Sequence, residues 1–120
     1  MIDVEAVMPV LTKLYSDISQ DITKARLICS TVCMELTERL KDESYSSNQE
    51  VIYACATVTL YRYCLNRNLS DDTYQSVRAG DITVKCSPSQ ILDSAEKFRD
   101  TALLNAYKYF KDVDFAFKVV

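Results

Sequence analysis

The sequence predicts a mainly α-helical fold: a small bundle of about four helices around a central buried helix, with a short β-hairpin and an extended C-terminal tail. The 120 residues include one glycine and two prolines, and so few chain-breaking residues favour long helices over an all-β fold. Residues 51–65 carry a single charge, on Arg62. This run is too long for an ordinary strand and too short for a bilayer, which takes about 20 apolar residues. A helix that is apolar on nearly all sides is buried on several of them, so we expect the other helices to surround it.

Two helices are expected before the central one. The first is capped by Asp3 and runs to about Tyr15, with Pro9 either kinking it or delaying its start. The second follows a polar break, is capped by Asp21 and runs to about Leu40. Its apolar residues recur at helical spacing and predict one buried stripe, formed by Ile22, Ala25, Cys29, Val32, Cys33, Leu36 and Leu40.

The central helix is predicted to begin with a capping box, because Ser47 and Glu50 have the S-x-x-E spacing. After a polar loop, residues 74–77 and 81–86 flank the only glycine of the chain, Gly80. Apolar and polar residues alternate in the second of these runs, which is the period of a strand. Because a tight connection favours glycine at a positive φ, we predict a β-hairpin here.

The last helix has a clear start, since Ser87 is a good N-cap and Pro88 suits the first helical position. It is expected to run to about Phe110. A tail of residues 113–120 follows, in which apolar residues alternate as in an extended segment. The predicted inner face of the helix consists of Ile91, Ala95, Phe98, Ala102, Ala106 and Tyr109.

Length and charge limit the classes of function. The chain is expected to form a single domain, residues 1–120. Its net charge is −3 and it contains no basic block, which argues against electrostatic capture of DNA or RNA. No membrane span or secretory signal is evident in the sequence. Five cysteines, an odd number, suit reduced thiols in a cytosol.

Few residues point to catalysis. The chain has no histidine, which removes the commonest general base and the nucleophilic pairs that depend on it. Cys29 and Cys33 share a helix face and could bind a metal, but the further ligands of a zinc site are missing, so buried thiols are the favoured interpretation. The carboxylate pairs Asp71–Asp72 and Asp112/Asp114 could bind Mg²⁺ or act as acid and base, although solvated surface is the simpler interpretation. We therefore expect no enzymatic activity and no cofactor.

The hairpin and the tail leave two interpretations open. A two-stranded hairpin is marginally stable alone in water, and free strand edges are templates for pairing with another chain. Either the tail pairs with the hairpin of its own chain and closes the core, or both are assembly elements that contact other subunits.

Two motifs carry a resemblance to a known family. Residues 76–83 (SVRAGDIT) precede a long helix, and residues 112–117 (DVDFAF) follow it. In this arrangement residues 21–120 resemble the head–tail connector proteins of tailed phages and prophages, which are also called adaptor or head-completion proteins.

The resemblance implies a ring of about a dozen copies in the virion neck, made in the cytoplasm of a bacterial host. The expected partners are further copies, the portal protein and the next neck or tail-completion protein, with DNA only as cargo in the channel and no membrane. The alternative is a helical protein-interaction adaptor or regulator without a virion role. The resemblance assigns the contacts to hairpin and tail residues, namely Val77, Arg78, Gly80, Asp81, Ile82, Val84, Phe115, Phe117 and Val119.

Overall fold

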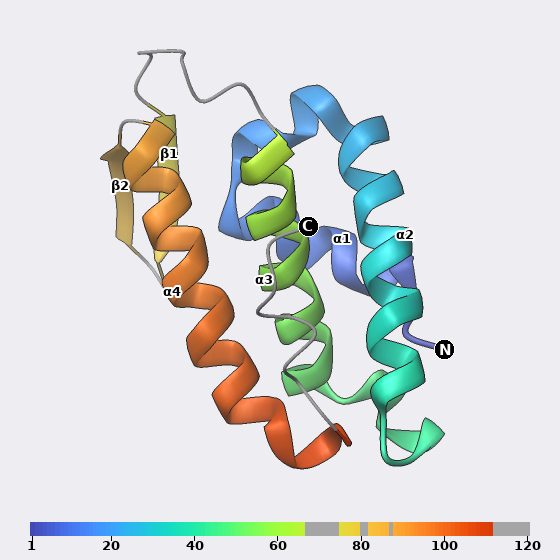
Figure 1. Cartoon of the computed structure of the whole chain (residues 1–120). Coiled ribbons are helices and arrows are strands. Elements are labelled where there is room, and N and C mark those ends of the chain that lie inside the picture. The colour runs from blue at the N-terminus through green and yellow to red at the C-terminus, as the bar shows by residue number, and fades with distance from the viewer. Residues whose placement is uncertain (67–74, 80–81, 87, 112–120) are drawn as a thin grey trace.

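The computed structural model describes residues 1–66, 75–79, 82–86 and 88–111, and for residues 75–79, 82–86 and 88–90 it describes the backbone only. Within these ranges the chain is mainly helical, with four α-helices, three short 3₁₀-helices and two strands (Figure 1). In chain order the elements are α1 (Val4–Leu14), η1 (Ser16–Asp21), α2 (Ile22–Arg39), η2 (Glu43–Ser47), α3 (Gln49–Asn66), β1 (Gln75–Ala79), β2 (Ile82–Cys86), α4 (Pro88–Ala106) and η3 (Tyr107–Tyr109).

The centre of the bundle is α3. It packs against α1, α2 and α4, and Figure 1 shows it between α2 and α4. Residues 54–61 are all buried, so this part of α3 has no face exposed to solvent. Thr57 donates a hydrogen bond to the carbonyl oxygen of Ala54 and Thr59 to that of Cys55, both at 2.8 Å, so neither buried hydroxyl is left unpaired. The predicted helical bundle around a central buried helix is therefore confirmed.

The start of α3 differs from the predicted capping box. Asn48 is the N-cap, because its Oδ1 accepts hydrogen bonds from the backbone N–H of Glu50 at 2.9 Å and of Val51 at 3.4 Å. Ser47 is the last residue of η2 and lies one position too early. The prediction that Ser47 caps this helix was wrong.

Replacing Asn48 by alanine is expected to lower the free energy of unfolding by about 1 kcal/mol, because two backbone N–H groups lose their acceptor. Ser47→Ala is the matched control and should change it by less than about 0.5 kcal/mol. Urea denaturation of both variants measures the difference. Equal losses in the two variants would contradict the cap at Asn48.

The first helix begins where the sequence places it. Asp3 caps α1 by accepting a hydrogen bond from the backbone N–H of Glu5 at 2.9 Å. The helix starts at Val4 and continues through Pro9, so the proline does not delay its start. Pro9 is exposed, and the Glu5 carbonyl oxygen that a proline leaves without a helical donor can therefore bond to water.

The predicted stripe of α2 is buried apart from its first residue. Ile22 is 37% exposed. Asp21 precedes the helix, but its side chain does not cap it. Its Oδ2 instead accepts a hydrogen bond from the hydroxyl of Tyr63 on α3, at 3.3 Å. The buried members of the stripe are Ala25, Cys29, Val32, Cys33, Leu36 and Leu40.

The inner face of α4 contains a charged residue that the periodicity did not predict. Arg99 is only 4% exposed, and its guanidinium carbon lies 4.1 Å from the centre of the Tyr61 ring. The guanidinium also forms an ion pair with Asp100 at 3.0 Å. Of the predicted inner face, Phe98 and Tyr109 are half-buried. Its fully buried members are Ile91, Ala95, Ala102 and Ala106.

The end of α4 is tied to the end of α2. An antiparallel bridge joins the segments that follow these two helices. The backbone N–H of Lys41 donates to the carbonyl oxygen of Tyr109 at 2.9 Å, and that of Lys111 donates to the carbonyl oxygen of Arg39 at 2.7 Å. These two hydrogen bonds join residues 39–41 to residues 109–111 at this end of the bundle.

In chain order, the strands β1 and β2 come after α3 and before α4. They pair in antiparallel register, with Val77 opposite Val84. They fall within the segments expected to form the hairpin, and β1 packs against α1 and α4. Figure 1 shows both strands beside the first turns of α4. The predicted tail, residues 113–120, lies outside the described residues. None of the helices in the described ranges combines the length and the apolar character needed to cross a membrane.

Candidate functional site

The residues predicted to contact other subunits fall into two groups. Val77, Arg78, Ile82 and Val84 belong to β1 and β2, and the register pairs Val77 with Val84, Arg78 with Thr83 and Ala79 with Ile82. The contact role of these strands stays a prediction. The other members of the set, Gly80, Asp81, Phe115, Phe117 and Val119, lie outside the described residues, as do the carboxylate pairs Asp71–Asp72 and Asp112/Asp114.

Figure 1 shows α2 and α4 on either side of α3. Large apolar side chains are exposed on both flanking segments. On α2, Leu27 is 67% and Met34 is 54% exposed; we call this pair the α2 patch. On the other flank, Leu104 of α4 is 68% and Tyr107 of η3 is 63% exposed, and these form the α4 patch. These four residues were not among the contact residues predicted from the sequence. For Leu27 and Met34, the sign of an exposed apolar patch in the sequence is their spacing. They lie two helical turns apart on α2 and outside its buried stripe.

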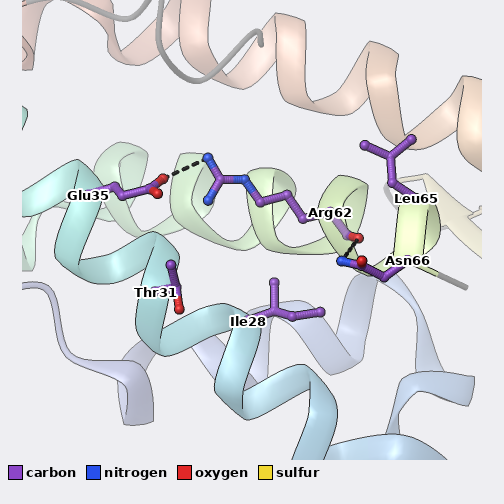
Figure 2. Close-up of a pocket in the computed structure, with 6 residues that line it drawn as sticks. All are labelled: Ile28, Thr31, Glu35, Arg62, Leu65 and Asn66. Carbon is purple, nitrogen blue, oxygen red and sulfur yellow. Dashed lines mark hydrogen bonds and ion pairs between the residues drawn. The ribbon is translucent and has the colours of Figure 1, made fainter. Parts of the chain in front are cut away.

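A groove of about 250 Å³ lies between α2 and α3. Figure 2 shows Glu35 and Arg62 pointing toward each other across it, and their ion pair measures 2.7 Å. The Nδ2 of Asn66 donates to the carbonyl oxygen of Arg62 at 2.9 Å. The opposite charges of Glu35 and Arg62 neutralise each other at this wall of the groove. Its lining is completed by Ile28, Thr31 and Leu65.

A second hollow of about 250 Å³ lies between α3 and α4, and its lining includes Glu50, Tyr53 and Asn105. The hydroxyl of Tyr109 donates to Glu50 Oε1 at a long 3.5 Å. The ring of Tyr109 meets that of Tyr45 edge to face, with centres 5.0 Å apart. Glu50 therefore links the lining of the hollow to a pair of aromatic rings packed beside it.

Three thiols meet in the core between α2 and α3. Cys29 and Cys33 share one face of α2, as predicted, and Cys55 approaches them from α3. The Sγ atoms of Cys33 and Cys55 are 3.3 Å apart, and those of Cys29 and Cys33 are 3.9 Å apart. All three side chains are fully buried. We call these residues the thiol cluster.

Contacts within the thiol cluster shift the pKa values of its members in opposite directions. A hydrogen bond from the Cys33 thiol, with a further one from Cys55, lowers the pKa of Cys29. The hydrogen bond to Cys29 raises the pKa of Cys33 to about 12. Hydrogen bonds to Cys29 and Cys33, together with burial, raise the pKa of Cys55. In the described part of the chain, no group of three or more histidine, cysteine, aspartate or glutamate side chains is arranged to hold a metal ion.

Comparisons with known proteins do not add to these observations. No protein-family model, curated protein or solved structure matches the chain.

Proposed function

We propose that this chain is a structural, non-enzymatic subunit of a phage or prophage neck. Copies of it form a ring that joins the portal to the next head-completion or tail protein and extends the DNA channel. The motifs at residues 76–83 and 112–117, which resemble those of connector proteins, support the virion role. The observation that carries the ring is the pair of exposed apolar patches on α2 and α4.

Two different patches favour a head-to-tail association. A two-fold dimer uses the same surface on both subunits, whereas a ring needs two distinct surfaces that fit each other. The α2 patch and the α4 patch belong to helices on either side of α3 (Figure 1), so one subunit is able to contact two neighbours at once. A specific interface buries about 800 Å² on each partner and depends on a few apolar anchors. Leu27 and Leu104 are the anchors that we propose for it.

The hairpin and the tail would supply the contacts along the neck. By the resemblance, residues 77–84 face the portal or a neighbouring subunit, and residues 115–119 dock on a partner. Ile82, Phe115 and Phe117 are the apolar anchors expected there. The net charge of −3 suits a channel through which DNA slides, because basic walls would hold the phosphates.

Placing a charge in either patch is expected to prevent ring formation on the portal. Leu27→Glu and Leu104→Glu each put a carboxylate at the centre of a desolvated contact, which is strongly unfavourable. The test is co-purification with a portal protein, followed by native mass spectrometry to count subunits. Gln20→Glu is the control, because it adds the same charge at an exposed position of η1 outside both patches. Circular dichroism should show unchanged helix content in all three variants.

A mixing experiment tests the head-to-tail arrangement itself. Leu27→Glu retains the α4 patch and Leu104→Glu retains the α2 patch, so a mixture of the two should form one-to-one pairs and no ring. Self-association of either variant alone would indicate a two-fold contact and contradict the proposed ring. If the unmodified chain does not bind the portal and stays a monomer or dimer, the helical interaction adaptor becomes the better assignment.

A further inference from the structure

The thiol cluster has no part in the proposed function. Free cysteine in a core usually packs as a small hydrophobe. Here, however, the sulfur of Cys33 contacts two other sulfurs, one on its own helix and one on α3. Thiols from two different helices therefore lie close to each other in the core.

The Cys33–Cys55 pair has the better geometry for a cross-link. A disulfide joins two sulfur atoms at about 2.05 Å, so sulfurs that are now 3.3 Å apart need only a small approach. Cys29 and Cys33 belong to the same helix, and their sulfurs are further apart, at 3.9 Å. A bond between Cys33 and Cys55 would join α2 to α3, two helices that already pack together.

We propose that Cys33 and Cys55 are a redox modification site that closes as a reversible disulfide between α2 and α3. The oxidant is hydrogen peroxide. The sulfur of Cys33 attacks one peroxide oxygen, the O–O bond breaks, and the departing hydroxide takes the thiol proton, which leaves a sulfenic acid and one water. The sulfur of Cys55 then attacks the sulfenic sulfur. The S–S bond forms as the S–O bond breaks, and the second hydroxide leaves with the Cys55 proton as water. Two thiols lose two electrons, and peroxide becomes two waters.

The reduced pair is the resting state at neutral pH. The raised pKa values of Cys33 and Cys55 keep both groups as thiols. Cys29, whose pKa is lowered, is the stronger nucleophile of the cluster, but its sulfur lies 3.9 Å from that of Cys33 on the same helix, so the distances assign the cross-link to Cys33 and Cys55. All three side chains are fully buried, so peroxide reaches them slowly and sustained exposure is needed to close the bond.

The experiment oxidises the folded, unmodified chain with hydrogen peroxide, alkylates the remaining thiols after denaturation and measures the mass. The expected product has lost two hydrogens and regains them on reduction with a dithiol. Trypsin cleaves after lysine and arginine, so the cross-link should join residues 27–39 to residues 42–62, and fragmentation of that pair should place the bond on Cys33. The oxidised form should melt at least about 5 °C higher than the reduced form, because the bond restricts the unfolded chain.

Single replacements provide the matched controls. Cys33→Ala and Cys55→Ala should lose the cross-link, whereas Cys29→Ala and Cys64→Ala should keep it. The peptide map of the unmodified chain gives the answer even where a variant fails to fold. A bond through Cys29, Cys64 or Cys86, a bond between two chains, or a chain that keeps all its thiols would overturn the proposal.

Discussion

Replacing Leu103 by alanine is expected to lower the free energy of unfolding by about 2–5 kcal/mol. Leu103 is fully buried on α4, in the face that packs against α3 and the rest of the core. Its truncation removes apolar contacts and leaves a cavity that rigid helices fill only in part, so both terms lower stability. Urea denaturation at constant pH, followed by circular dichroism, measures the loss.

The neighbouring leucine is a matched control for this change. Leu104 differs from Leu103 by one position on α4 but is 68% exposed. Leu104→Ala should change the free energy of unfolding by no more than about 0.5 kcal/mol. If both leucines gave the same loss, α4 would not be oriented as described.

Replacing Arg99 by methionine is expected to lower the free energy of unfolding by about 1–3 kcal/mol. Methionine keeps most of the packing of the arginine stem but removes the charge that lies over the Tyr61 ring. In a desolvated setting this interaction contributes about 2 kcal/mol, and the ion pair with Asp100 is lost as well. Thermal and urea unfolding of the variant give the magnitude.

A double-mutant cycle isolates the contact with the ring. Tyr61→Leu, Arg99→Met and the double variant should give a coupling energy of about 1–2 kcal/mol. Lys97→Met is the control, since Lys97 is exposed on the same helix. A coupling energy near zero would mean that burial of the stem, rather than the charge over the ring, explains the position of Arg99.

The sequence was a good guide where the signal is local. The apolar run of residues 51–65 predicted the central position of α3, and the spacing of apolar residues predicted the buried stripe of α2. Ser47 and Asn48 are both good capping residues. The choice between them follows from the 3₁₀ turn of η2, which ends at Ser47, and residue spacing does not reveal that turn.

Features that depend on distant partners could not be predicted in this way. Arg99 has the pattern of a solvent-facing charge until Tyr61 is placed beside it. The pair Cys29 and Cys33 was visible on one helix, but the third thiol, Cys55, comes from another. A single exposed leucine is ordinary, and only the arrangement of the helices shows that Leu27 and Leu104 belong to two helices on either side of α3. The predicted contact residues of the hairpin and the tail stay a prediction.

The length of α4 has a consequence for the architecture of a ring. The helix has 19 residues, which at about 1.5 Å per residue span about 28 Å. β2 ends just before its first residue, while Lys111, bonded to Arg39, marks the root of the tail beyond its last turn. Under the proposed function, with α4 along the channel axis, the strands at its start and Lys111 beyond its end lie at different heights in the ring. The length of α4 then sets the axial distance between the contacts that one protomer makes at these two levels.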